Sequence, residues 1–203
     1  MKILKFDNEQ EWLDARRGKI TGTRLKDLIV KRGNGRKKGF YEIIAERVAI
    51  PKSEENVMDR GKRLEVEAIE RFEKETGKKV NKDLVLICRD DNEDIAYSPD
   101  GFIGKTETIT ETIEAKCLNS ASHIEALLTG KIPNEYEEQT IQPFIVNDKL
   151  KKLHFVFYDP RMPKDFFYFT INRKDVKDKV QEYFEIEKQA LVEIAKIEKQ
   201  LTF

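Results

Sequence analysis

The spacing of the apolar residues changes near residue 80, and this change constrains the fold more than any other feature of the chain. Up to Gly77 the apolar side chains recur at roughly three- to four-residue intervals, which is typical of amphipathic helices. From Lys82 onward, short apolar or alternating runs such as 84–88 and 153–158 are typical of strands. A chain with both patterns must pack helices against a sheet.

The order of the patterns predicts an α/β fold in which helices flank a central mixed β-sheet. Helices are expected over residues 7–15, 23–30, 40–48, 57–76, 119–128, 134–147 and 174–200. Strands are expected over residues 82–89, 95–98, 108–118, 153–158 and 165–171. Pro143 should kink or shift the helix that contains it, because proline cannot donate a backbone hydrogen bond.

The chain has no internal repeat and no linker rich in proline, glycine or serine, so its 203 residues are expected to form one domain. We expect a helical N-terminal part (1–77), a sheet with its flanking helices (78–172) and a C-terminal helix (173–203). No apolar run approaches the roughly 20 residues of a membrane span, and the first residues do not resemble a signal peptide. A cytoplasmic protein is therefore expected.

The few cysteines and histidines exclude several classes of site. Cys88 and Cys117 cannot build a disulfide framework or a four-cysteine metal or iron–sulfur site. His123 and His154 form no paired-histidine metal motif. Zinc hydrolases and histidine-metal nucleases are therefore poor candidates.

The net charge of zero hides a partition along the chain. Residues 1–50 carry 13 basic and 7 acidic side chains, residues 51–150 carry 14 and 22, and residues 151–203 carry 11 and 9. The three segments therefore have net charges of +6, −8 and +2. A basic first segment keeps a nucleic-acid partner possible despite the neutral total.

Two short motifs in the expected strands place acidic and basic side chains together. Pro99-Asp100-Gly101 is followed by Glu114-Ala115-Lys116, and alternation along a strand puts Glu114 and Lys116 on one face. A turn at Asp100 can bring its carboxylate beside Glu114, which would suit Mg²⁺ because this ion prefers oxygen ligands. The same residues also fit an ordinary turn followed by a strand with a charged, solvated face.

Further polar residues could join this site. Glu65 lies in the helix before the strands, where it could reach the site or be a surface glutamate. Arg16, Thr21 and Thr23 offer a guanidinium and two hydroxyls near a helix start, which suits a phosphate group. A threonine at a helix start is equally typical of an ordinary helix cap.

Taken together, the motifs resemble those of phage lambda exonuclease and the YqaJ-type viral recombinase nucleases, a branch of the PD-(D/E)xK superfamily. The matching residues occur in the same order from about residue 12 to 170. They are Trp12, Arg16-x-Gly18-x-Ile20-Thr21, Gly61-Lys62-x-x-Glu65-x-x-Ala68, Phe72-Glu73-x-x-Thr76-Gly77, Ser98-Pro99-Asp100-Gly101, Glu114-x-Lys116, Tyr136-x-x-Gln139 and Tyr158-Asp159-Pro160-Arg161-Met162.

The resemblance implies a role for each matched residue. Asp100 and Glu114 would bind the metal together with the backbone carbonyl of Ala115, and Glu65 would assist metal or water. Lys116 would orient or deprotonate the attacking water. Gln139 would be the glutamine of the active site, although Gln142, three residues further on, is an alternative.

The resemblance also implies DNA contacts. The residues at positions that hold a terminal 5′-phosphate are Arg16, Thr21, Thr23 and Ser98. Met58 stands where an apolar wedge that separates the strands is expected. Independently, the basic run that includes Arg36, Lys37 and Lys38 is a candidate contact to the DNA backbone.

The function implied is a Mg²⁺-dependent exodeoxyribonuclease that digests one strand of linear duplex DNA from a 5′-phosphorylated end. Mn²⁺ is expected to substitute for Mg²⁺, with one or two ions per site. The family further implies a homotrimeric ring, a single-strand-annealing partner in phage recombination, and a phage or prophage origin. The alternatives are a restriction- or repair-type endonuclease of the same superfamily, or a non-catalytic DNA-binding protein on this fold.

Overall fold

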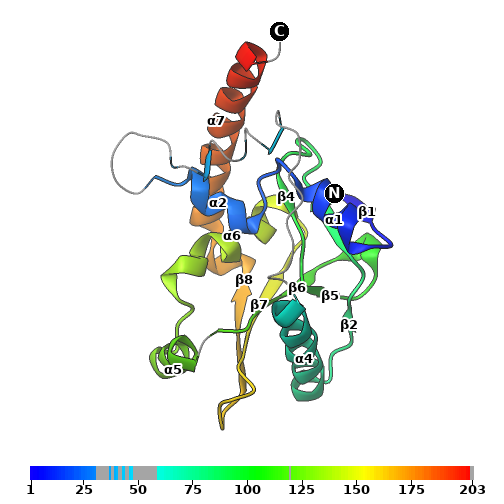
Figure 1. Ribbon diagram of the computed structural model, residues 1–203, viewed down its shortest axis with the longest axis vertical. Coiled ribbons are helices and arrows are strands. Elements are labelled where there is room, and N and C mark those ends of the chain that lie inside the picture. Colours follow the sequence, from blue (N-terminus) through cyan, green and yellow to red (C-terminus); the bar gives the residue numbers. More distant parts are fainter. Residues whose placement is uncertain are drawn as a thin grey trace.

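The chain folds into two β-sheets surrounded by helices, as the computed structural model shows for residues 1–30, 37, 39, 40, 43, 46, 47, 59–118 and 120–201 (Figure 1). The smaller sheet has the strand order β1-β3-β4 and the larger has the order β2-β5-β6-β7-β8. Within the larger sheet β6 and β7 run parallel and the other neighbours run antiparallel. The predicted α/β class with a central mixed sheet flanked by helices is therefore confirmed.

The described strands are divided between the two sheets. The strands of the smaller sheet are β1 (Lys2–Lys5), β3 (Val85–Cys88) and β4 (Ala96–Tyr97). Those of the larger sheet are β2 (Val80–Asn81), β5 (Gly101–Ile103), β6 (Glu111–Lys116), β7 (Lys152–Tyr158) and β8 (Phe166–Asn172). Three of these strands, β1, β2 and β5, have no counterpart among the predicted elements.

The helices follow the predicted order. They are α1 (Glu9–Arg16), α2 (Gly22–Leu28), α4 (Asp59–Thr76), α5 (Ser120–Thr129), α6 (Glu137–Val146) and α7 (Lys177–Leu201), with 3-10 turns η1 (Thr106–Thr108), η2 (Asn134–Tyr136) and η3 (Arg173–Asp175). Most of the predicted helix over 40–48 lies outside the described residues. Pro143 lies inside α6, which begins after η2 and so starts later than predicted. No described helix is long and apolar enough to cross a membrane.

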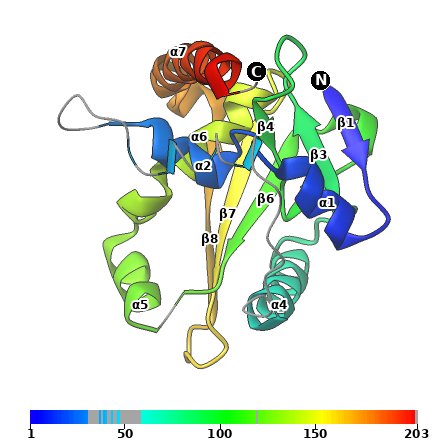
Figure 2. The same cartoon turned by 45° about the horizontal axis from the view of Figure 1, so that its top comes forward.

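Helices cover both faces of the larger sheet (Figures 1 and 2). On one face Phe72 of α4 is fully buried in a cluster that includes Ile113 of β6 and Val156 of β7. On the other face Phe144 of α6 packs in a cluster with Phe155 of β7 and with Ala126 of α5. The charged central strand β6 is therefore held between two apolar layers.

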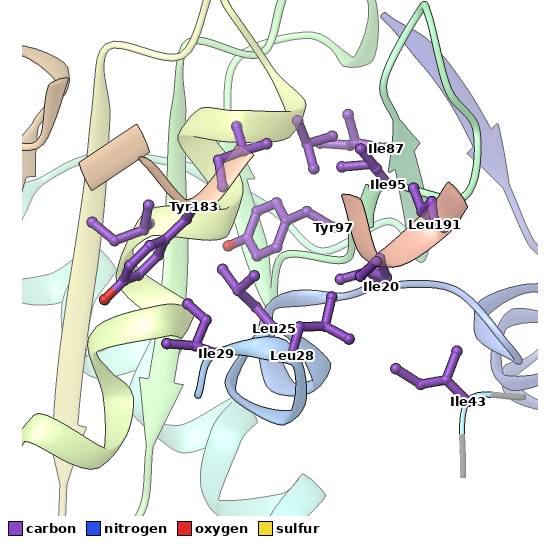
Figure 3. Close-up of a cluster of buried hydrophobic side chains, with 14 of the residues drawn as sticks. Ile20, Leu25, Leu28, Ile29, Ile43, Ile87, Ile95, Tyr97, Tyr183 and Leu191 are labelled. Atoms are coloured by element: carbon purple, nitrogen blue, oxygen red, sulfur yellow. The ribbon is translucent and has the colours of Figure 1, made fainter. Parts of the chain in front are cut away.

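A third apolar cluster joins α2, α6 and α7 to the smaller sheet (Figure 3). Its residues include Ile20 and Leu25 near α2, Tyr97 of β4, and Tyr183 and Leu191 of α7. Ile20 also forms an isolated parallel bridge with Ile95, just before β4. The segment before α2 is thereby fixed against the strand that leads to Asp100.

Candidate active site

The motifs predicted to carry chemistry meet in one cavity of about 480 Å³ between α1, α4 and the edges of the two sheets. Seven of the predicted site residues line it, among them five whose side chains come from far apart in the sequence: Arg16, Glu65, Ser98, Asp100 and Glu114. Lys116 and Thr23 also line it. Since acidic side chains outnumber basic ones in this lining, we call it the acidic cavity.

Asp100 lies where β4 turns into β5, and the backbone of β6 holds its side chain. The backbone N–H of Ala115 donates a 2.7 Å hydrogen bond to Asp100 Oδ2. Burial and the neighbouring Glu114 raise the pKa of Asp100 well above its usual range. The next residue, Gly101, has no space for a side chain, because a Cβ at this position would lie 2.5 Å from a side-chain carbon of Val80 on β2.

Glu114 and Lys116 lie on the same face of β6, as alternation predicted. Lys116 Nζ donates a 2.7 Å hydrogen bond to Glu114 Oε1, and the buried hydroxyl of Tyr97 lies 3.4 Å from Glu114 Oε2. Burial lowers the pKa of Lys116, but Glu114 and Asp100 outweigh this effect and raise it above the ordinary value. Lys116 is therefore an ammonium ion paired with a carboxylate.

The oxygen atoms of this site suit a divalent cation. Asp100 and Glu114 bring two carboxylates together in a partly buried place where their mutual repulsion favours a bound positive charge. Glu65 lines the same cavity from α4. Within the described part of the chain, no group of three or more His, Cys, Asp or Glu side chains is arranged to hold a metal ion. Two carboxylates and backbone or water oxygens would therefore have to complete the coordination.

Neither Cys117 nor the two histidines take part in this cavity. Burial and Glu65 raise the pKa of the nearby Cys117 thiol to about 12, so the thiol is neutral and a poor nucleophile at physiological pH. His154 is buried, with its ring nitrogens 2.9 Å from Thr170 Oγ1 and 3.0 Å from Glu111 Oε2. His123 is also buried, against the backbone of Lys164.

Arg16 stands at the border of the acidic cavity. Its guanidinium carbon lies 4.2 Å from the centre of the Trp12 ring, one turn earlier on α1. Burial lowers the pKa of Arg16, while Glu114, Asp100 and Glu65 act in the opposite direction. Its Nε is buried without a hydrogen-bond partner, so one donor of a charged side chain is left for a bound anion.

A second cavity of about 470 Å³ adjoins the first, and we call it the arginine cavity. Arg16 and Thr23 line both cavities, and the arginine cavity is completed by Leu13, Asp14, Arg17, Thr21, Arg24 and Glu46. The hydroxyls of Thr21 and Thr23 lie 3.2 Å apart. Thr21 precedes α2 but does not cap it through its side chain. The two hydroxyls thus remain near a cluster of guanidinium groups.

Ser98 is tied into the structure more firmly than its sequence position suggested. Its hydroxyl donates a 2.9 Å hydrogen bond to the carbonyl oxygen of Val85 and accepts one of 2.9 Å from Trp12 Nε1. Ser98 could donate a hydrogen bond to a phosphate only if its hydroxyl rotated away from the carbonyl oxygen of Val85. Trp12, one of the residues that match the family, is a hydrogen-bond donor in the lining of the cavity.

The two candidate glutamines have different surroundings. Gln142 is fully buried, and its Nε2 lies 3.0 Å from the carbonyl oxygen of Ile20. Gln139 is also buried, and its Oε1 has no hydrogen-bond partner. Neither glutamine is among the lining residues of the acidic cavity. The assignment of Gln139 to the active site therefore stays a prediction.

The remaining predicted contacts lie mostly outside the described residues. Arg36, Lys38 and Met58 belong to that part of the chain. Lys37 is described and exposed, and its Nζ donates a 2.7 Å hydrogen bond to the carbonyl oxygen of Lys26. The basic run and the wedge thus stay predictions.

Comparison with known proteins identifies relatives that cover most of the chain. The family model of the YqaJ-like viral recombinase domain matches residues 11–149. A crystal structure of LHK-Exo in complex with dAMP has a TM-score of 0.77 and 30% sequence identity, covering 95% of this chain and 98% of that chain. A structure of the alkaline exonuclease LHK-Exo from Laribacter hongkongensis has a TM-score of 0.78 and 29% identity, with the same coverage. No curated protein sequence matched.

Proposed function

We propose a function from the premise that this chain belongs to the YqaJ-like viral recombinase family, whose members are nucleases that hydrolyse DNA phosphodiester bonds. The proposed activity is that of a lambda-type exonuclease that digests one strand of linear duplex DNA in the 5′-to-3′ direction. The resulting 3′ single strand would be a substrate for recombination by strand annealing. The alkaline exonuclease activity named for its structural relative supports this proposal.

The observation that carries the proposal is the arrangement of Asp100, Glu114 and Lys116 in the acidic cavity. The two carboxylates supply hard oxygen ligands, and the Lys116 ammonium lies 2.7 Å from one of them. This set fits the metal dependence of the family, and we assign Asp100, Glu114 and the Ala115 carbonyl as ligands of Mg²⁺, with Mn²⁺ as a substitute. Glu65 is a further candidate ligand. When bound, the ion would polarise the scissile phosphodiester and offset charge on the leaving oxygen.

The residues of the chain would then position the reactants. Ala115 N–H fixes Asp100 through a 2.7 Å hydrogen bond, and Tyr97 lies in hydrogen-bond range of the second oxygen of Glu114. Lys116, an ammonium ion on the same strand face, would orient the attacking water rather than act as its base. Gln139 is retained as the proposed glutamine of the site.

We assign the terminal 5′-phosphate to the place where the acidic and arginine cavities meet. Arg16 has a buried Nε without a partner there, and the hydroxyls of Thr21 and Thr23 lie nearby. A phosphate held at this point would lie next to the carboxylates and lysine of the acidic cavity. This location favours cleavage near a 5′ end. Ser98 is a further candidate, provided that its hydroxyl rotates away from Val85.

The direction of digestion can be measured with linear duplexes that carry one label at either the 5′ or the 3′ end of a strand. With Mg²⁺ present, the label at a 5′ end should be released early and the label at a 3′ end late. Early release of the 3′ label would refute the proposed direction while leaving the nuclease activity standing.

The assembly and partners follow from the family rather than from contacts of this chain. We propose a homotrimeric ring around the DNA and cooperation with a single-strand-annealing protein in the cytoplasm of a phage-infected or lysogenic cell. Met58 as a strand wedge and Arg36, Lys37 and Lys38 as backbone contacts belong to the same proposal.

A further inference from the structure

The buried side chain of Gln142 connects three separate parts of the fold. Its Nε2 lies 3.0 Å from the carbonyl oxygen of Ile20 and 3.4 Å from that of Ala96, and the residue has no exposed surface. A primary amide has two N–H groups, so these two carbonyl oxygens use both of them. Gln142 therefore clamps the segment before α2 and strand β4 onto α6.

Both clamped carbonyl groups lie close in sequence to proposed site residues. Ile20 directly precedes Thr21, which lines the arginine cavity. Ala96 lies on β4, two residues before Ser98 and four before Asp100, and its backbone N–H donates a 3.0 Å hydrogen bond to the same Ile20 oxygen. The Gln142 amide thus adds to the backbone bridge between Ile20 and β4 and attaches both segments to α6.

Glu187 of α7 brings a carboxyl group to this amide from the opposite side. Tyr183 and Leu191, one turn before and one turn after Glu187, point into the apolar cluster that contains Ile20 and Tyr97 (Figure 3). Glu187 shares their helix face, has no exposed surface, and interacts with Gln142. Neither of its oxygens has a hydrogen-bond partner, and Gln142 Oε1 has none either.

These facts leave one consistent arrangement of hydrogen atoms. Turning the Gln142 amide around would point its oxygen at two carbonyl oxygens and leave both without a donor from this amide. The amide oxygen therefore faces Glu187, and an ionised carboxylate has no proton to donate to it. Three unpaired acceptor oxygens in a fully buried place would be strongly unfavourable.

We propose that Glu187 is a positioning residue whose carboxyl group stays protonated in the folded protein and donates its O–H to Gln142 Oε1, fixing the amide that attaches the segment before α2 and strand β4 to α6. The protonation of Glu187 rests on its complete burial and on the unpartnered oxygens of Glu187 and Gln142. Its consequence for catalysis rests on the function proposed above.

The surroundings of Glu187 agree with a neutral carboxyl group. Burial raises its pKa to about 8, although Gln142 and Arg89 act in the opposite direction. Arg89 forms ion pairs with Asp91 and Asp148, at 2.7 and 3.4 Å, and its buried Nε has no hydrogen-bond partner. The hydroxyl of Tyr183 donates to Glu137, 3.0 Å away. The residues of α2 in this cluster, Leu25 and Leu28, are apolar.

The first test uses the thermal unfolding of the full chain and does not depend on activity. A carboxyl group that ionises at a higher pH in the folded than in the unfolded protein stabilises fully below about pH 4.5, and this contribution is lost as the pH rises to about 8. Glu187→Gln keeps the donor but cannot ionise. Its Tm relative to wild type should therefore rise from about pH 5 to about 8 and then level off.

Glu182→Gln is the matched control, because Glu182 lies exposed on the same helix. Its Tm should run parallel to that of the wild type at every pH. A constant difference between Glu187→Gln and wild type over this range would show that Glu187 is ionised as an ordinary glutamate, which would overturn the proposal.

The second test measures kcat and KM on linear duplex DNA with 5′-phosphorylated ends. Glu187→Leu removes the donor and should raise KM by about three- to tenfold with a smaller change in kcat, whereas Glu187→Gln should retain the wild-type KM. Equal KM values for both variants would overturn the positioning role. If the wild type itself digests no DNA, the proposed function fails, while the unfolding experiment still decides the protonation of Glu187.

Discussion

Asp100 shows how one residue can be prepared for a cation by its neighbours. Its carboxylate accepts a hydrogen bond from the Ala115 N–H, which favours the ionised form, while burial and Glu114 disfavour it. The result is a raised pKa, and therefore a side chain whose charge destabilises the folded protein near neutral pH unless a cation is bound. The proposed metal binding needs this negative charge on Asp100.

Replacing Asp100 or Glu114 by the corresponding amide should abolish the nuclease activity without unfolding the protein. Each change removes one proposed metal ligand, and we expect kcat to fall by more than about 100-fold. Because the folded-state pKa of Asp100 is raised, Asp100→Asn should be at least as stable as wild type at neutral pH. Nucleotide release and thermal unfolding would be measured together.

Asp83→Asn is the control, since Asp83 lines the same cavity but pairs with Lys5 at 3.5 Å. It should retain most of the activity. If both Asp100→Asn and Glu114→Gln also retained activity, the assignment of the metal site would be wrong.

Arg16→Ala should selectively impair digestion of 5′-phosphorylated ends. The guanidinium would donate charged hydrogen bonds to the terminal phosphate, so its loss should cost about 10- to 100-fold in kcat/KM on these ends. Ends without a phosphate should lose much less. Arg63→Ala, an exposed change on α4, serves as control. An equal loss on both kinds of end would argue against a phosphate pocket at Arg16.

At the residue scale, the sequence motifs predicted the residues of the acidic cavity but not the side chains that hold these residues in place. Asp100, Glu114 and Lys116 could be found because turn chemistry and strand alternation place them together. The supporting roles of Trp12 and Tyr97 could not be found in this way. Trp12 bonds to Ser98, 86 positions away, and Tyr97 bonds to Glu114 on another strand, and neither contact leaves a local pattern in the sequence. The role of Gln142 likewise depends on tertiary contacts with Ile20 and Ala96.

At the element scale, the predictions succeeded where an element is long and periodic. Helices α4 and α7 and strands β6 to β8 have enough residues for their period to be read. Strands β1, β2 and β5 have only 4, 2 and 3 residues, and unlike the equally short β3 and β4 they do not lie in an apolar run that was recognised as a strand. Strand β1 forms through backbone pairing with β3, even though Lys2 and Lys5 stand at its ends.

Phe72→Ala tests how strongly α4 is docked on the larger sheet. The Phe72 ring is fully buried, 5.1 Å from the ring of His154 and 5.2 Å from that of Tyr168. Removing it should lower the free energy of unfolding by about 3–5 kcal/mol, measured by denaturant titration. Val192→Ala on α7, 58% exposed in the wild type, should change it by less than about 0.5 kcal/mol. A Phe72→Ala protein as stable as this control would contradict the docking described.

At the scale of the whole molecule, the neutral total charge is divided between neighbouring sites. The arginine cavity carries Arg16, Arg17 and Arg24, whereas the adjoining acidic cavity is dominated by carboxylates such as Asp100 and Glu114. A phosphate and a cation could therefore be held side by side. The sequence showed a basic first segment and an acidic middle, but the contact between them required the fold, because α1 and β6 lie about 100 positions apart.

Neutralising Arg36, Lys37 and Lys38 together should weaken DNA binding for all sequences. The slope of log K against log salt should flatten by about 0.9 for each phosphate group that the protein no longer neutralises. A triple change of Lys174, Lys196 and Lys199, exposed lysines around α7, removes the same charge and should leave the slope nearly unchanged. Identical slopes for the wild type and the variant at 36–38 would assign that run to solvent.

The central claim is tested most directly by one digestion experiment with the wild-type protein and three DNA substrates, each with and without Mg²⁺. The substrates are linear duplex with 5′-phosphate, the same duplex without it, and closed circular duplex. We predict Mg²⁺-dependent release of nucleotides that is fastest from the phosphorylated linear duplex, slower without the phosphate, and absent from the circle. Cleavage of the closed circle would identify an endonuclease instead, and no digestion of any substrate would contradict the catalytic assignment altogether.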